Sequence, residues 1–172
     1  DPRACGWDPA EMQCKAGASG TDCLSEAQVN ALRTVYRGVQ TIDGRTAAWP
    51  LERGGEAGWS IFIGVSGKDP TNGGGLGGLW GPILGDPSFD TTKFDPAADL
   101  ARVRSSDFAK AYEANNPDIG AFANRGGKLL LWHGWSDPGP SPVATITYFQ
   151  QVEGALGQGQ STARLFLAPG VS

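Results

Sequence analysis

The chain has 172 residues, a formal net charge of -4 and 40% hydrophobic residues, which is ordinary for a globular protein. This acidic balance argues against nucleic acid as a partner, because proteins that bind a phosphate backbone usually present a basic face. The 26 glycines, 12 prolines and 6 tryptophans, against one methionine, are typical of a loop-rich chain pinned by large rings rather than of a helical bundle.

Three cysteines, Cys5, Cys14 and Cys23, lie near the start of the chain among prolines, glycines and aspartates. Such clustering in a segment poor in helix formers indicates a disulfide framework in an exported protein. Because the count is odd, one cysteine is expected to have its partner elsewhere. The wide spacing and the lack of a nearby histidine disfavour a zinc or redox site.

The first clear helix is predicted to begin after Ser25. Ser25 can cap the helix and Gln28 can return a hydrogen bond to the cap, which is the capping-box pattern. Gly38 can end the helix. Apolar residues recur between them at helical spacing, namely Val29, Leu32, Val35 and Tyr36. We interpret this segment as a packed structural helix.

The middle of the chain, residues 39–95, shows little regular periodicity. Its glycine run at 73–78 lacks the Gly-Lys-Ser/Thr ending of a phosphate-binding loop, so it predicts a surface loop instead. Residues 97–114 carry a weak helical pattern, and the Asn-Asn-Pro-Asp sequence at 115–118 breaks it. A short turn is expected over 119–122.

The most informative stretch starts at Gly126-Gly127. The following Leu-Leu-Leu-Trp run, closed by Gly134, predicts a short strand that is apolar on both faces, as in buried parallel sheets. Asp137 comes next, at the strand end where open α/β sheets place functional groups. A helix over 141–152 and a second buried strand over 164–169 complete a strand, acidic loop, helix and strand.

These motifs resemble the C-terminal part of the tannase and feruloyl esterase family of α/β-hydrolases. The resemblance rests on His-Gly-Trp-Ser-Asp-Pro at 133–138, Gly-Gly-Lys-Leu before it and Arg-Leu-Phe-Leu-Ala-Pro-Gly after it. It implies an α/β chain that is a C-terminal α/β-hydrolase fragment with an irregular, loop-rich lid domain. Residues 1–115 would form part of the lid, and residues 116–172 the C-terminal part of the core.

The resemblance also implies an activity. The parent protein would be a secreted serine carboxylic ester hydrolase for aromatic acid esters, such as feruloyl or galloyl esters, and would need no cofactor for catalysis. Asp137 matches the acid of its Ser-His-Asp triad, which follows the chain order Ser, Asp, His. The base would be the histidine of a Gly-x-x-His-Cys segment just after the last strand, one residue beyond Ser172, and the nucleophile would lie before Asp1. The 172 residues alone are therefore expected to be inactive.

Further expectations follow from the same family. Cys14 and Cys23 would close a local loop, and Cys5 would pair with a cysteine of an upstream calcium-binding loop in a secreted or periplasmic parent. The rest of that parent would be the main protein partner, with no nucleic acid and no membrane. Lid residues would bind the aromatic ring, although the same rings could simply form the lid's own core. These candidates are Trp59, Phe62, Leu76, Leu79 and Trp80.

His133 is the only histidine, yet it lies on the same strand end as Asp137. Because acid and base come from different loops in this architecture, we expect His133 and Trp135 to support the acid loop rather than to act as base. Asp137 has a simpler interpretation, as a turn residue before Pro138. Two other functions stay open: another α/β-hydrolase, such as a peptidase or lipase-like enzyme, or a non-catalytic carbohydrate or phenolic binding module.

Overall fold

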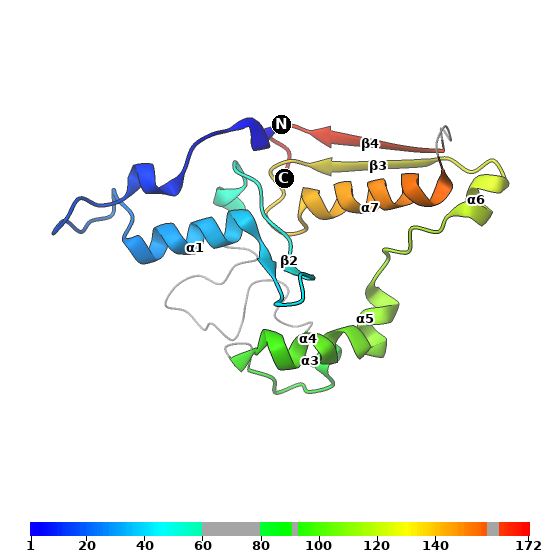
Figure 1. The fold of residues 1–172 in the computed structure, drawn as a ribbon, viewed down its shortest axis with the longest axis horizontal. Helices are drawn as coiled ribbons and strands as arrows, with labels where there is room; N and C mark the ends of the chain where they lie inside the picture. The colour runs from blue at the N-terminus through cyan, green and yellow to red at the C-terminus, as the bar shows by residue number, and fades with distance from the viewer. Residues whose placement is uncertain (60–79, 91–92, 158–161) are drawn as a thin grey trace.

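The computed structural model describes residues 1–59, 80–90, 93–157 and 162–172, without the side chains of Trp80 and Pro96. Helices and strands are mixed along the chain (Figure 1). In chain order, the described elements are η1 (Pro2–Ala4), η2 (Pro9–Met12), α1 (Glu26–Arg37), β1 (Val39–Gln40), β2 (Thr46–Ala48), η3 (Glu56–Gly58), α3 (Trp80–Leu84), α4 (Pro96–Ser105), α5 (Asp107–Tyr112), α6 (Gly120–Asn124), β3 (Leu129–Gly134), α7 (Pro142–Leu156) and β4 (Ala163–Ala168).

The predicted strand, acidic loop, helix and strand are confirmed as β3, α7 and β4. The two strands are parallel and in register from Leu129 opposite Ala163 to Gly134 opposite Ala168. A parallel pair needs a crossover, and α7 supplies it on one face of the sheet (Figure 1). Ser141 caps α7 by accepting a hydrogen bond from the Val143 amide. The helix runs past the predicted residue 152, to Leu156.

The other face of this small sheet differs from the expectation of a strand buried on both sides. Successive side chains of a strand point to opposite faces. Those turned away from α7 are open, with exposed fractions of 65% for Leu130, 68% for Trp132 and 57% for Phe166. Within the described residues, only α7 makes extensive helix contacts with β3 and β4. An apolar sheet face is therefore left uncovered.

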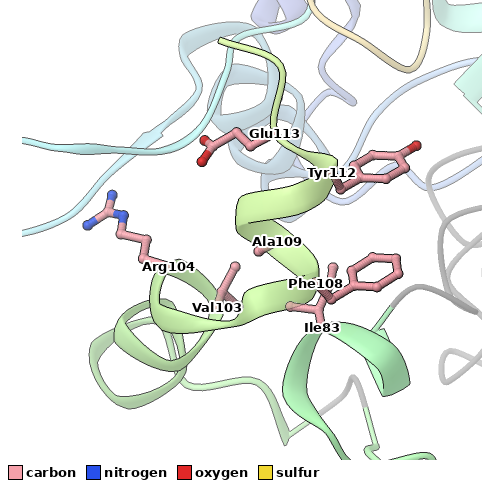
Figure 2. A pocket seen from close by; sticks show the side chains of 7 residues that line it. All are labelled: Ile83, Val103, Arg104, Phe108, Ala109, Tyr112 and Glu113. Carbon is pink, nitrogen blue, oxygen red and sulfur yellow. The ribbon is translucent and has the colours of Figure 1, made fainter. Parts of the chain in front are cut away.

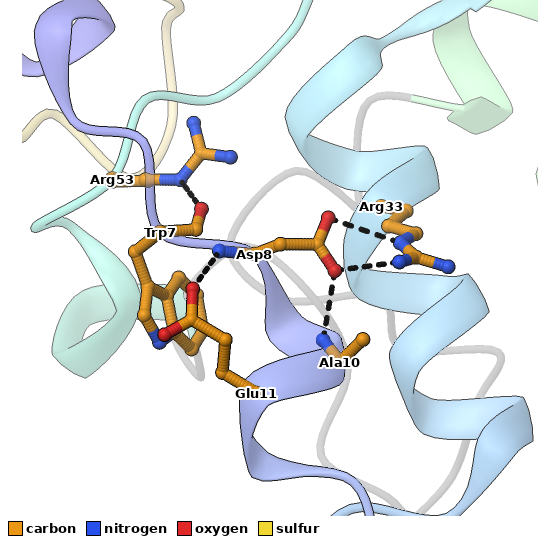
Figure 3. Close-up of polar contacts among 6 residues, drawn as sticks. All are labelled: Trp7, Asp8, Ala10, Glu11, Arg33 and Arg53. Atoms are coloured by element: carbon orange, nitrogen blue, oxygen red, sulfur yellow. Dashed lines mark hydrogen bonds and ion pairs between the residues drawn. The ribbon is translucent and has the colours of Figure 1, made fainter.

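Helix α1 confirms the prediction made from its cap. The Ser25 side chain accepts from the Gln28 amide, the Gln28 side chain accepts from the Ser25 amide, and Gly38 ends the helix at φ +71°. Val29 is almost fully buried. Figure 3 shows how α1 is tied to η2: Asp8 caps η2 and accepts two hydrogen bonds from the Arg33 guanidinium.

The single weak helix predicted over 97–114 is instead two helices, α4 and α5. Ser106 adopts an extended conformation between them, and its side chain accepts from the Ala109 amide. A new N-cap therefore starts a second helix where the first one stops. The turn predicted over 119–122 is the beginning of the short helix α6.

The N-terminal segment is closed by the predicted disulfide between Cys14 and Cys23, which the structure confirms. A backbone bridge between Gln13 and Leu24 lies beside it. Cys5 is an exposed free thiol among the described residues, so its pairing stays a prediction. Within the described ranges, no helix has the length and apolar character needed to cross a membrane.

Candidate active site

The acid loop, residues 134–141, leaves the carboxyl end of β3. Its backbone is tied to the segment that follows β4, because the Trp135 amide donates to Ala168 and the Ser136 amide donates to Val171, each at 3.0 Å. Gly134 permits this approach. A Cβ atom at Gly134 would lie 2.1 Å from the carbonyl oxygen of Val171. The acid loop and the residues after β4 therefore form one packed edge of the sheet.

Asp137 is held at this edge with its carboxylate partly open. Its Oδ1 accepts a hydrogen bond from the Gly139 amide at 2.9 Å, and its Oδ2 lies 3.4 Å from Nε2 of His133. The side chain is 26% exposed. The hydrogen bond from the Gly139 amide is the one expected if Asp137 were only a turn residue before Pro138. It occupies one of the two carboxylate oxygens. Among the described residues, the second oxygen accepts no hydrogen bond and faces Nε2 of His133.

His133 contacts both the acid loop and α7. Its Nε2 lies 3.1 Å from the carbonyl oxygen of Pro140, and its Nδ1 lies 2.7 Å from Oγ1 of Thr145. A carbonyl can only accept, so Nε2 carries the hydrogen, and in the neutral ring Nδ1 accepts from the Thr145 hydroxyl. Both ring nitrogens are therefore engaged. This geometry agrees with support of the loop, while the role itself stays a prediction.

Trp135 is buried, with 5% of its surface exposed. The Arg3 guanidinium lies 4.8 Å from the centre of its ring, a distance that allows a cation–π contact. The first residues of the chain therefore lie against the acid loop. In Figure 1 the two ends of the chain are drawn near each other. Sequence patterns carry no signal for a contact between residues so far apart.

A second segment, residues 54–58, packs against the acid loop. A Cβ atom at Gly55 would lie 2.7 Å from the carbonyl oxygen of Ser136, and one at Gly58 would lie 2.6 Å from Cγ of Pro138. The Ser141 hydroxyl donates to the carbonyl oxygen of Pro50 at 2.5 Å. The sequence carries no signal for this contact, because isolated glycines in an irregular stretch look like ordinary turns.

Among the predicted ring-binding residues, Trp59 is the one whose side chain is described. Its ring lies 5.6 Å from that of Tyr36, which in turn contacts the Trp7 ring and the Arg53 guanidinium. Its Nε1 is buried and has no hydrogen-bond partner in the described part of the chain. Phe62, Leu76 and Leu79 lie outside the described residues, as does the side chain of Trp80. Substrate binding by these residues stays a prediction.

Glu52 is a buried acidic residue, with 8% of its surface exposed. Burial raises the pKa of Glu52, and the positive charges of Arg3 and Arg53 partly offset the rise. The Arg53 side chain is held by the carbonyl oxygen of Trp7 (Figure 3). None of these side chains forms a metal-binding group, since no cluster of three or more His, Cys, Asp or Glu suited to a metal occurs in the described ranges.

An apolar pocket of about 190 Å³ lies apart from the acid loop, among α3, α4 and α5 (Figure 2). The rings of Phe108 and Tyr112 stack beside it, 5.8 Å apart. Their spacing of four residues on a helix is a signal that sequence analysis could have used. The pocket is lined by Ile83, Val103, Arg104, Phe108, Ala109, Tyr112 and Glu113.

The sequence model described as "Tannase and feruloyl esterase" matches residues 75–172, more than half of the chain and all of β3, α7 and β4. The chain belongs to the tannase and feruloyl esterase family. An uncharacterized esterase of Xanthomonas campestris pv. campestris is 30% identical over 99% of this chain and 34% of its own length. The mono(2-hydroxyethyl) terephthalate hydrolase of Piscinibacter sakaiensis is 28% identical over 99% of this chain and 35% of its own length.

The fold is shared with solved structures of this tannase and feruloyl esterase family. Feruloyl esterase B from Aspergillus oryzae superposes with a TM-score of 0.80 at 22% identity, over 98% of this chain and 34% of that one. At this identity the likeness establishes the α/β-hydrolase type of fold alone. The chain spans about a third of the length of the relatives that it matches.

Proposed function

We propose that the intact protein is a serine carboxylic ester hydrolase that acts on esters of aromatic acids, with Asp137 as the acid of a Ser-His-Asp triad. The observation that carries this proposal is the position of Asp137 in a family of named esterases. It follows the carboxyl end of β3, its side chain is 26% exposed, and its Oδ2 accepts no hydrogen bond among the described residues. A triad acid needs such an oxygen, since it accepts the Nδ1 hydrogen of the catalytic histidine.

The base of this triad would come from the polypeptide that follows β4. The Ser136 amide donates to Val171, so that segment lies directly against the acid loop. A histidine a few residues further on could reach Asp137 from another loop, as the architecture requires. His133 is a poor base in comparison, because both of its ring nitrogens are engaged.

The proposed chemistry is a two-step hydrolysis. The serine oxygen attacks the ester carbonyl while the histidine takes the serine proton, and the histidine then gives that proton to the departing alcohol. Water, activated by the same histidine, splits the acyl-enzyme and releases the aromatic acid. Asp137 fixes the tautomer of the histidine and stabilises its cation. The nucleophile and the base are assigned to parts of the protein outside the printed sequence.

The aromatic acyl group is supported by the names of the relatives. They include a feruloyl esterase B of Aspergillus niger, 26% identical over 94% of this chain, and the terephthalate hydrolase described above. We assign residues 1–115 to a lid that supplies ring-binding side chains such as Trp59. Feruloyl, galloyl and terephthaloyl esters are accordingly the first substrates to test.

The proposal extends to the remainder of the protein and to the location of the enzyme. The remainder of the protein would pack on the open sheet face formed by Leu130, Trp132 and Phe166, and would provide the partner of Cys5 and a structural calcium site. The Cys14–Cys23 disulfide supports secretion or a periplasmic location, because disulfides persist in oxidising compartments.

The deciding experiment uses the full-length parent protein. Wild type and Asp137→Asn are assayed on methyl ferulate, methyl gallate and mono(2-hydroxyethyl) terephthalate, and circular dichroism verifies that both are folded. We expect a loss of kcat on the order of 10⁴ in the variant. A folded Asp137→Asn enzyme with near-normal turnover would remove Asp137 from the mechanism. A folded wild type that binds these compounds without hydrolysing them would favour the binding-module alternative.

A further inference from the structure

Residues 54–58 contact the acid loop on both sides of the proposed triad acid. Gly55 approaches the backbone of Ser136 and Gly58 approaches the ring of Pro138, which are the two neighbours of Asp137. Gly55 and Pro138 are buried at this contact. Because a backbone carbonyl and a proline ring cannot swing aside, the distance between the two segments is set by the absence of side chains on the glycines.

The backbone conformation does not itself require glycine at these two positions. Gly55 has φ -99° and ψ 0°, which other residues can adopt, and Gly58 ends η3 without a positive φ. Gly54, with φ +102°, is different. A methyl group at Gly55 or Gly58 therefore tests the close approach to the acid loop and not backbone strain.

Residues 54–58 are anchored to α1 through Glu56. One carboxylate oxygen of Glu56 accepts from the Tyr36 hydroxyl at 2.6 Å, and the other accepts from the Gly54 amide at 2.8 Å. Burial and the Glu56 carboxylate raise the pKa of Tyr36, so its hydroxyl stays a donor throughout the neutral range. Residues 54–58 are thus tied to α1 by a contact that does not involve the acid loop.

We propose that Gly55 and Gly58 are positioning residues for Asp137, and that the Tyr36–Glu56 pair holds them in place. This inference rests on the proposed esterase function. The acid loop is in contact both with residues 54–58 and with Val171. Displacement on one side moves the carboxylate relative to the histidine that it must meet.

A displaced acid has a specific kinetic signature. The negative charge of the acid favours the protonated form of the catalytic histidine and so raises its pKa. With the acid moved away, the pKa of the histidine falls, and the acidic limb of the kcat/KM profile shifts to lower pH. Turnover falls because the cation is less well stabilised. Gly58 directly precedes Trp59, a proposed ring-binding residue, so an unchanged KM is expected for Gly55→Ala alone. A general loss of stability would not move the limb.

The test compares Gly55→Ala, Gly58→Ala and Tyr36→Phe in the full-length enzyme. Tyr36→Phe adds no volume and releases one hydrogen bond, so it keeps the test open if a methyl variant does not fold. The matched control is Gly154→Ala, since Gly154 lies exposed on α7 and a Cβ there would have no atom within 4 Å. Each enzyme is measured for kcat, KM and the pH profile, beside its melting temperature.

For the two glycine variants we expect a loss of kcat of about ten- to a hundredfold and an acidic limb displaced to lower pH, with unchanged KM in Gly55→Ala. Tyr36→Phe should displace the acidic limb in the same direction by less, and Gly154→Ala should not displace it. One outcome would overturn the positioning role alone. In it, Gly55→Ala and Gly58→Ala are folded and keep the wild-type kcat and the wild-type acidic limb of the pH profile, while Asp137→Asn is inactive. A wild type inactive on every ester would overturn the proposed function and this inference together.

Discussion

The Nε2 nitrogen of His133 lies 3.4 Å from Oδ2 of Asp137, four residues further along the chain. The pair resembles the acid and base of a triad by composition, but its geometry differs. Nε2 is nearer to the carbonyl oxygen of Pro140, at 3.1 Å, and Nδ1 is engaged by Thr145. Only 11% of the His133 side chain is exposed. The His133 ring, on β3, therefore contacts both Thr145 of α7 and Pro140 of the acid loop.

This arrangement predicts a graded response to substitution. His133→Gln should lower kcat by about ten- to a hundredfold, because the acid loop loses part of its support, whereas Asp137→Asn should cost on the order of 10⁴. Thr145→Val should cost about 1 kcal/mol of stability, the usual worth of one lost hydrogen bond. Turnover and thermal unfolding of the full-length enzyme measure both effects. A 10⁴-fold loss in a folded His133→Gln variant would make His133 the base.

The close contact between Gly134 and Val171 gives a second prediction. Gly134→Ala places a methyl group where the Val171 carbonyl oxygen now lies, so the acid loop and the residues after β4 must separate. We expect a destabilisation of about 1–3 kcal/mol, typical of overpacking, together with reduced kcat. Gly6→Ala is the control, since a Cβ at Gly6 would meet no atom within 4 Å. If Gly134→Ala had the melting temperature and the turnover of wild type, the close contact between Gly134 and Val171 would not exist in solution.

The parts of the fold that the sequence predicted are those with local signals. The capping box at Ser25 marked α1, and the apolar run before Asp137 marked β3. Contacts made by irregular segments were missed, since the approach of Gly55 to Ser136 joins residues about 80 positions apart and leaves no periodic pattern. The break between α4 and α5 did have a signal, the N-cap at Ser106, but the weak apolar pattern on both sides hid it.

Within the candidate site, the family resemblance pointed to Asp137 as triad acid and to His133 as support for the acid loop, and both roles stay predictions. The contacts around these two residues could be found only from the folded structure. The stacking of Arg3 on Trp135 depends on how the N-terminal segment returns to the sheet edge, and no motif encodes that path. The same holds for the burial of Glu52, which as a charged residue in a loop is expected to be exposed.

Glu52 provides a pH-dependent prediction. Burial raises its pKa above the ordinary value of 4.5, so the folded protein binds this proton more tightly than the unfolded chain does. The stability that comes with the proton is complete below pH 4.5 and is lost as the pH rises through the folded pKa. Glu52→Gln should therefore melt at a higher temperature than wild type at pH 8, and the gap should close as the pH falls toward 4.5.

Thermal unfolding of both proteins across this pH range makes the comparison. Glu26→Gln, on the exposed first turn of α1, serves as the matched control. A carboxylate near a helix N-terminus is stabilising, so this variant should melt slightly below wild type at pH 8, in the opposite direction to Glu52→Gln. A Glu52→Gln protein that melts below wild type at pH 8 would mean that the attraction of Arg3 and Arg53 outweighs the cost of burial.

The open face of the β3–β4 sheet yields the last prediction. Parallel sheets are covered on both faces in α/β proteins, yet Trp132 is 68% exposed within the described residues. If the remainder of the full-length protein packs on this face, Trp132→Ala should destabilise that protein by about 3–5 kcal/mol, as a buried ring does. Ile42→Ala, at a position 109% exposed, should change stability by less than about 0.5 kcal/mol. Urea unfolding of the three proteins separates the outcomes, because a Trp132→Ala effect as small as that of Ile42→Ala would mean that the face stays open to solvent.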